Sequence, residues 1–271
     1  MGFSITVCVV LGMFFTYYVT VIVGVVLPWM EHSVPGMLNV AFFTVEAGMG
    51  MNSYLRCIFS DPGKVPQDYV PDLEAQAHQV KRKTGKARYC NTCANYKPMR
   101  AHHCRKCNRC VLRMDHHCVW INNCVGHGNY RNFMAFLLYT TAAVIHATVL
   151  LCAHSVHVLD ARRARNHAIN RSRTVGKLLP KAAGGAVERA ARHHRRGASS
   201  GATALLTATQ TLCTFFGIPL SLALVMLTAW HLYLIYHNKV SHSLALSFLR
   251  VKSECVCVCV CGVVGCAADD D

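Results

Sequence analysis

A long uncharged stretch at the start of this chain restricts its possible folds more than any other sequence feature. Residues 3–29 contain no charged side chain, and a helix needs only about 20 apolar residues to cross the hydrocarbon core of a bilayer. A cleaved signal peptide is the alternative, but the stretch has no positively charged start and no clear small-residue cleavage site. We therefore expect a transmembrane helix that stays in the protein.

Three later apolar segments, and a hydrophobic content of 53%, extend this expectation to the whole chain. We predict an α-helical multi-pass membrane protein with four transmembrane helices and a cytosolic cysteine-rich domain between helices 2 and 3. The predicted segments are transmembrane helices 1 and 2 in residues 1–59 (the second at about 37–59), the cysteine-rich domain in 60–132, transmembrane helix 3 in 133–159, a basic low-complexity loop in 160–203, transmembrane helix 4 in 204–237 and a C-terminal tail in 238–271.

Several polar side chains fall inside or at the ends of these apolar segments. Glu46 lies in the middle of the second one, where an ionisable group is either functional or a hydrogen-bonded packing residue, and we favour packing. His154 and His157 share one helix face. A second metal site is one interpretation of this pair, and histidines at the membrane interface are the interpretation that we favour.

The basic residues are concentrated in two segments. Residues 60–132 hold 13 Lys and Arg against five Asp and Glu, and residues 160–203 hold 11 against two. Basic loops next to apolar spans typically face anionic lipid or anionic substrates. Four spans place 60–132 in the cytosol, as the positive-inside rule expects, but they place 160–203 on the opposite side, against the same rule.

Cysteines and histidines gather in residues 88–133 in a pattern that indicates metal binding. Seven of the sixteen cysteines lie there, at positions 90, 93, 104, 107, 110, 118 and 124, with paired histidines at 102/103 and 116/117. Overlapping CxxC pairs with nearby histidines are typical of structural zinc sites in a reducing compartment. Two closed sites need eight ligands, which six cysteines and two histidines supply, so one cysteine remains free.

The neighbouring residues indicate which cysteine that is. Cys118 directly follows Asp115, His116 and His117. An imidazole there can take the thiol proton, and a carboxylate can fix the imidazole tautomer. Basic surroundings and nearby zinc would also lower the thiol pKa. We therefore predict Cys118 as the nucleophile.

The same stretch resembles the DHHC-type protein S-acyltransferases, also called palmitoyltransferases. The resemblance is carried by this run of residues: Cys90-x2-Cys93-x9-His103-Cys104-x2-Cys107-x2-Cys110-x4-Asp115-His116-His117-Cys118-x5-Cys124, followed by Asn129 and Phe133. The Asp61-Pro62-Gly63 turn and the four-span plan are also similar to that family.

The resemblance implies a ligand set for each of two structural zinc ions. One set is Cys90, Cys93, His103 and Cys110, and the other is Cys104, Cys107, His117 and Cys124. It also implies the reaction. Cys118 would accept a fatty acyl group, with palmitoyl the expected chain, from the co-substrate acyl-CoA, with His116 as base and Asp115 orienting it, and pass it to cysteines of substrate proteins.

Two departures from the family pattern favour a second function. Val119 stands where the family usually has proline, and residues 240–243 read Val-Ser-His-Ser where it commonly has Thr-Thr-x-Glu. The alternating Cys and Val of residues 255–261 are interpreted as low-complexity sequence. The alternative is therefore a catalytically weak zinc-module scaffold that binds membrane partners.

The expected partners follow from these interpretations. They are acyl-CoA, cysteine-containing substrate proteins and the lipid bilayer. A nucleic-acid-binding zinc finger fits the charge and the CxxC pairs but not four apolar spans, so we expect no nucleic acid. The expected location is an endomembrane, Golgi or ER, with the active site facing the cytosol.

Overall fold

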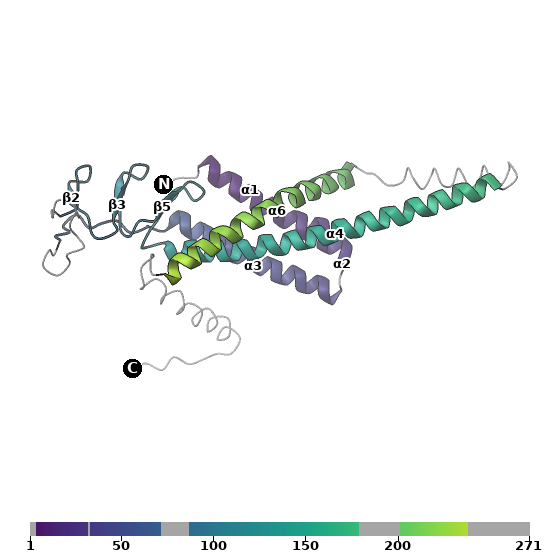
Figure 1. The fold of residues 1–271 in the computed structure, drawn as a ribbon, viewed down its shortest axis with the longest axis horizontal. Coiled ribbons are helices and arrows are strands. Elements are labelled where there is room, and N and C mark those ends of the chain that lie inside the picture. Colours follow the sequence, from purple (N-terminus) through teal and green to yellow (C-terminus); the bar gives the residue numbers. More distant parts are fainter. Residues whose placement is uncertain (1–3, 32, 72–86, 179–200, 238–271) are drawn as a thin grey trace, which may run out of the picture. The chain divides into compact units, whose positions relative to one another are not determined.

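The computed structural model describes residues 4–31, 33–71, 87–178 and 201–237 (Figure 1). The predicted tail 238–271 and residues 179–200 of the predicted loop lie outside these ranges. The chain forms two compact units. One consists of Met1–Gly12, Gly48–Thr141 and Leu224–Asp271, and the other of Met13–Ala47 and Ala142–Ala223.

Long helices make up most of the described chain, and each of them continues from one unit into the other. In chain order they are α1 (Ile5–Val21), which runs on through the π-helical η1 (Ile22–Val26) into α2 (Leu27–Met30), then α3 (Val34–Phe59), α4 (Tyr130–Leu178) and α6 (Gly201–Tyr236). Ser33 caps the start of α3, because its Oγ accepts a hydrogen bond from the Gly36 amide at 3.2 Å.

Three of these helices are long and apolar enough to cross a membrane. They are Ile5–Met30, Tyr130–Ser172 and Leu205–Tyr236. The prediction of four such helices is therefore confirmed for three of them. The predicted second span forms a helix, α3, but polar side chains such as Asn39, Glu46 and Arg56 keep its hydropathy below that of the others.

Helix α4 is longer than the sequence analysis predicted. Residues 160–178 are helical, so the prediction of a loop from residue 160 is wrong for this part. The physical reason is the local sequence, which is rich in the helix formers Ala and Arg and contains neither proline nor glycine between Asp160 and Val175.

The unit made of residues 13–47 and 142–223 encloses a polar cluster among apolar side chains. His146 Nδ1 lies 2.9 Å from Glu46 Oε2, and His146 Nε2 lies 3.0 Å from Asn39 Oδ1. Asn39 in turn donates to the Pro35 carbonyl at 2.8 Å. The Glu46 carboxyl is therefore hydrogen-bonded, as the packing interpretation predicts.

The other unit contains three short antiparallel β-hairpins, one after another in the sequence. Hairpin 1 pairs β1 (Tyr89–Cys90) with β2 (Asn95–Tyr96), hairpin 2 pairs β3 (His102–Cys104) with β4 (Arg109–Val111), and hairpin 3 pairs β5 (His116–Cys118) with β6 (Asn123–Val125). Cys90, Cys104 and Cys118 end the first strands of the three hairpins, each 14 residues after the one before. The hairpins are thus repeats of one unit.

The loops of the three hairpins have the same length and the same backbone shape. Each has four residues, and the fourth, Ala94, Asn108 or Asn122, has a positive φ of 48°. Asparagine tolerates this left-handed conformation better than most residues, and it stands at two of the three positions.

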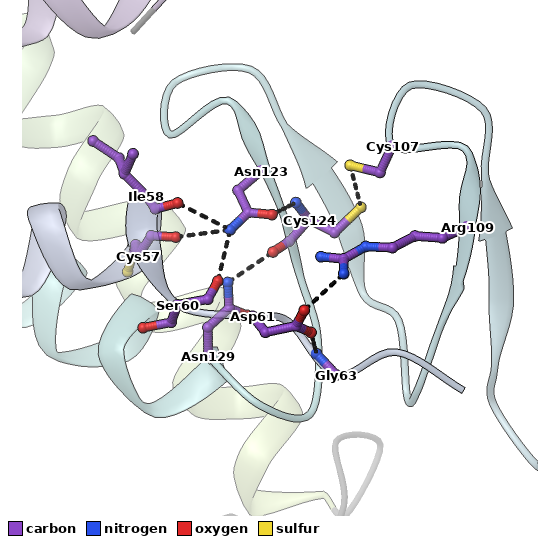
Figure 2. A network of polar contacts seen from close by, with 10 residues as sticks. All are labelled: Cys57, Ile58, Ser60, Asp61, Gly63, Cys107, Arg109, Asn123, Cys124 and Asn129. Atoms are coloured by element: carbon purple, nitrogen blue, oxygen red, sulfur yellow. Dashed lines mark hydrogen bonds and ion pairs between the residues drawn. The ribbon is translucent and has the colours of Figure 1, made fainter. Parts of the chain in front are cut away.

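Hairpin 3 is fixed to the end of α3 by Asn123, whose side chain is completely buried (Figure 2). Its Nδ2 donates to the carbonyls of Cys57 at 3.1 Å and Ser60 at 2.9 Å. Its Oδ1 accepts from the Cys124 amide at 2.9 Å. The last carbonyls of a helix have no partner within the helix, so Asn123 satisfies them and sets where hairpin 3 lies on α3.

Replacing Asn123 should therefore destabilise this unit. We expect Asn123→Ala to lower the free energy of unfolding by about 2–4 kcal/mol, because buried carbonyls lose their donor. Thermal unfolding in detergent, followed by circular dichroism, measures the change. Asn166→Ala, at an exposed position on α4, is the control and should shift stability by less than about 0.5 kcal/mol. Equal effects of the two substitutions would contradict this role of Asn123.

Candidate active site and metal centres

Two clusters of cysteine and histidine side chains lie in the hairpin unit. One consists of Cys90, Cys93, His103 and Cys110, and the other of Cys104, Cys107, His117 and Cys124. Within each cluster the potential ligand atoms all lie within 4.8 Å of one another. These are the two groups of residues that the sequence analysis named as ligand sets.

The hairpin repeat explains how each cluster forms. Each takes two cysteines from the loop region of one hairpin, and a histidine and a cysteine that face each other across the strands of the next. His103 is the register partner of Cys110 in hairpin 2, and His117 is the partner of Cys124 in hairpin 3. Neighbouring hairpins are therefore tied together through their side chains.

The distances in the clusters fit a tetrahedral zinc ion. Cys93 Sγ lies 3.2 Å from His103 Nδ1. In the second cluster His117 Nδ1 lies 3.5 Å from the sulfurs of both Cys104 and Cys107. A tetrahedron with Zn–S of about 2.3 Å and Zn–N of about 2.0 Å has ligand separations of about 3.5–3.8 Å. Three sulfurs and one imidazole also match the ligand types that zinc prefers.

The crowding of sulfur atoms points to a cation as well. Burial and the neighbouring sulfurs of Cys90 and Cys93 raise the pKa of the Cys110 thiol to about 12. Burial and the sulfurs of Cys104 and Cys107 raise the pKa of Cys124 in the same way. Several thiolates so close together repel one another, and a divalent cation removes this cost by binding them.

Cys118 lies outside both clusters, although it occupies the same place in hairpin 3 as Cys90 and Cys104 do in hairpins 1 and 2. The difference is in the loop. The third loop residue is Cys93 in hairpin 1 and Cys107 in hairpin 2, but it is Ile121 in hairpin 3. Ile121 is completely buried in an apolar cluster that includes Tyr54 and Phe133. The loop region of hairpin 3 therefore offers a single sulfur, that of Cys118, whereas the loop regions of hairpins 1 and 2 each offer a pair.

Asp115, His116 and Cys118 form a connected group. His116 Nδ1 lies 2.9 Å from Asp115 Oδ2, and the His116 ring also hydrogen-bonds to the Cys118 thiol. The bonds to Asp115 and Cys118 outweigh burial and raise the pKa of His116 to about 9. Asp115 has a lowered pKa because its carboxylate accepts the bond from His116.

Cys118 is buried, with only 8% of the residue exposed. This burial acts to raise its pKa, but hydrogen bonds from His116 and from the backbone amides of Ile121 and Trp120 outweigh it, so the pKa is lowered. The amide of Cys107 likewise donates to Cys104 Sγ at 3.4 Å in hairpin 2. The same type of loop therefore donates amide hydrogen bonds to a sulfur of a metal cluster in hairpin 2 and stabilises the thiolate of Cys118 in hairpin 3.

Sequence reasoning missed His231, which α6 brings to this site. Its side chain is buried, its ring centroid lies 6.4 Å from that of His116, and its Nδ1 lies 3.2 Å from the Tyr130 hydroxyl. Phe133 packs edge-on against both His116 and His231. A lone histidine near the end of an apolar segment was the available signal, but nothing in the sequence links it to a site about 115 residues earlier.

Among the basic residues of this unit, Arg109 has a structural partner. Its Nη1 lies 2.7 Å from Asp61 Oδ2, and Asp61 Oδ1 accepts from the Gly63 amide at 2.7 Å (Figure 2). Gly63 has a φ of 99°, which favours glycine. Asp61-Pro62-Gly63 therefore forms a turn that joins the end of α3 to hairpin 2.

Elemental analysis should find two zinc ions per purified chain. His103→Ala should reduce this to one, because the substitution removes a ligand from one cluster only. Cys152→Ser on α4, outside both clusters, should leave two. Two zinc ions in His103→Ala would contradict the assignment of that ligand.

The comparisons with known proteins agree with this geometry. The model of the DHHC palmitoyltransferase family matches residues 83–245. Probable protein S-acyltransferase 16 of Arabidopsis thaliana is 39% identical over 244 residues, which cover 89% of this chain and 73% of the relative. Palmitoyltransferase ZDHHC3 of Homo sapiens is 32% identical over 159 residues, which cover 56% of this chain and 51% of the relative. The chain belongs to the DHHC palmitoyltransferase family.

Proposed function

We propose that this DHHC-family acyltransferase moves a fatty acyl group from acyl-CoA to cysteines of substrate proteins through a thioester on Cys118, with palmitoyl as the expected chain. The observation that carries the proposal is the state of Cys118. It ends strand β5 next to a loop whose amides stabilise a thiolate, it is hydrogen-bonded to His116, and it belongs to neither cysteine cluster. The names of the matched relatives, S-acyltransferases and palmitoyltransferases, support the reaction type.

The reaction proceeds in two thioester exchanges. His116 takes the thiol proton, and the Cys118 thiolate attacks the carbonyl carbon of acyl-CoA. The bond from that carbon to the CoA sulfur breaks, and the CoA thiolate takes the proton from His116. A substrate cysteine then loses its proton to His116 and attacks the acyl-Cys118 thioester, and Cys118 leaves as the thiolate. Asp115 holds the ring of His116 throughout, through the 2.9 Å contact.

The two metal clusters have a structural role in this proposal. Zinc, when bound, would supply a tetrahedral crosslink between neighbouring hairpins, and no ligand position remains for substrate. The four residues of each cluster hold their hairpins in register. Hairpin 3 in turn holds Cys118 and His116, because both belong to β5.

The loop of hairpin 3 supports a position of the active site at the membrane surface. Val119 and Trp120 are exposed at 59% and 57%, and the Trp120 carbonyl accepts a hydrogen bond from Tyr54 on α3 at 2.8 Å. Exposed apolar and tryptophan side chains are typical of the interface between lipid and water. Arg105 and Lys106, both exposed in the loop of hairpin 2, are candidates for the phosphates of CoA.

We further propose that α3 is the second of four spans and that the hairpin unit faces the cytosol, in a Golgi or ER membrane. Its 26 residues give a length of about 39 Å, enough for the hydrocarbon core. Its polar residues Asn39 and Glu46 are paired with His146, so they need not face lipid.

A catalytically weak scaffold is the second candidate function. Val119 replaces the usual proline, and the usual Thr-Thr-x-Glu segment is missing from the sequence at residues 240–243, which lie outside the described residues. A scaffold would keep its metal ions and bind partners without passing on an acyl group.

Incubation with labelled palmitoyl-CoA should label the purified wild-type chain at Cys118. Cys118→Ser should lower the labelling by more than about a thousandfold, because the nucleophile is lost. Cys152→Ser should label like the wild type. Mass spectrometry of the labelled peptide identifies the position.

Two results of this experiment would contradict the proposal. Unchanged labelling in Cys118→Ser would show that another residue accepts the acyl group. A wild-type chain that binds two zinc ions and transfers no label to a substrate cysteine would favour the scaffold.

Protease protection in sealed vesicles tests the four spans. With α3 in the membrane, a tag at the N-terminus and a tag within residues 72–86 should be digested together from the cytosolic side. A tag within 180–200 is the control, because α4 separates it from residues 72–86, and it should be protected whenever the hairpin unit is cytosolic, whether α3 spans or not. Protection of only one of the first two tags would show that α3 does not cross.

A further inference from the structure

A cavity of about 390 Å³ lies in the unit made of residues 13–47 and 142–223, far along the chain from the active site. One wall is the end of the first helical segment, at Pro28 and Trp29. The other wall is one face of α4. The residues of α4 that line the cavity are His154, His157, Val158, Ala161, Arg162 and Arg165. Neither the proposed reaction nor the metal clusters use any of them.

Ring contacts and one hydrogen bond fix the aromatic side chains in the wall of this cavity. The Trp29 ring lies 5.4 Å from the ring of His154 and 5.6 Å from that of His157, measured between centroids. Gln210 Nε2 lies 2.7 Å from His154 Nδ1. An amide nitrogen only donates, so Nδ1 accepts, and the proton of the neutral ring is on Nε2. His154 therefore keeps a ring N–H as a donor.

The remaining part of the lining is cationic. Arg162 and Arg165 are three residues apart on α4, so they lie on one face of the helix. Neither guanidinium has a hydrogen bond or an ion pair among the described residues. The nearby carboxylate of Asp160 is paired instead with Arg163, at 3.2 Å. No acidic side chain lines the cavity, so its two positive charges are not compensated.

The cavity begins, at His154, where α4 is expected to leave the hydrocarbon core of a membrane. A helix that enters the hydrocarbon core at Phe133 leaves it about 20 residues later, near Ala153. His154 then lies at the interface. Arg162 and Arg165 lie a few turns beyond, and their long side chains can extend back toward the headgroups. Trp29, at the end of the first span, is at the depth typical of interfacial tryptophans.

We propose that this cavity binds the phosphate of an anionic phospholipid headgroup. Two arginines and a ring N–H are the donors that phosphate oxygens require, and arginine suits them best because its fork bonds two oxygens at once. Trp29, Pro28 and Val158 offer apolar surface to the glycerol and the first acyl carbons. A zwitterionic headgroup fits less well, because its ammonium group would meet two arginines and no carboxylate.

The proposal also accounts for the charge of the following segment. Residues 160–203 hold 11 basic and two acidic residues, on the side of the membrane where four spans make such charge unusual. A phosphate bound in the cavity would offset part of that charge.

Native mass spectrometry of the purified full-length chain tests the proposal. The probes are dioleoyl phosphatidylglycerol, dioleoyl phosphatidylcholine and inorganic phosphate. We expect phosphatidylglycerol to bind the wild type at least about tenfold more tightly than phosphatidylcholine. The double variant Arg162→Gln/Arg165→Gln should weaken phosphatidylglycerol binding by about 30-fold, because two charge-assisted contacts are lost.

Arg163→Gln is the matched control. It removes the same charge from the same helix, but Arg163 pairs with Asp160 and does not line the cavity. Its affinity for phosphatidylglycerol should stay within about twofold of the wild type. All three arginines are exposed, and labelling of Cys118 by palmitoyl-CoA, which should be unchanged in both variants, checks that they fold.

Three results would overturn the proposal. Equal phosphatidylglycerol binding by the wild type and the double variant would place the lipid elsewhere. Equal binding of phosphatidylcholine and phosphatidylglycerol would remove the preference for an anionic headgroup. Inorganic phosphate that binds as tightly as phosphatidylglycerol, and is lost in the double variant, would make the occupant a soluble phosphate and not a lipid.

Discussion

Backbone amides that point at a cysteine sulfur are the interaction on which the hairpin unit depends. In hairpins 2 and 3, a four-residue loop with a left-handed fourth residue turns the amides of its second and third residues toward the sulfur at the end of the first strand. Amide donors stabilise a thiolate whether or not a metal is present. The same loop therefore serves two chemistries, and the third loop residue decides between them. Cysteine gives a pair of ligands, and Ile121 leaves Cys118 alone.

The helices provide what the hairpins cannot provide for themselves. The three hairpins have strands of only two or three residues, so they have little apolar surface to bury. An isolated hairpin is marginally stable in water. Asn123 attaches hairpin 3 to the last carbonyls of α3, and α4 and α6 bring Phe133 and His231 to His116. The nucleophile is thus buried in a small domain that could not bury it alone.

Much of this arrangement could be predicted from the sequence, because it depends on the spacing of residues that are close together in the chain. The cysteine and histidine pattern predicted two metal clusters, and the family resemblance implied which residues form each of them. The apolar stretches predicted four spans, of which three are long and apolar enough to cross a membrane. The 14-residue period of the hairpins is also visible in the sequence, at Cys90, Cys104 and Cys118. It would have shown that Ile121 stands in the place of a ligand.

The features that could not be predicted depend on tertiary contacts or on weak preferences. His231 reaches the active site only because α6 packs there. The pairing of Glu46 with His146 joins residues 100 apart. Helix α4 continues beyond residue 160 because nothing in the local sequence stops it, and a high density of arginine resembles both a solvated loop and a solvated helix.

The three hairpins carry six cluster cysteines besides Cys118, and this has a consequence for selectivity. An activated thioester such as acyl-CoA reacts with whichever thiolate it meets, and Cys104 and Cys118 end equivalent strands of equivalent hairpins. A sulfur bound to metal has its reactive electron pair engaged in the metal–sulfur bond. Zinc in both clusters would then act as a protecting group, in the sense used in organic synthesis, that leaves Cys118 as the one cysteine of the three hairpins open to acylation.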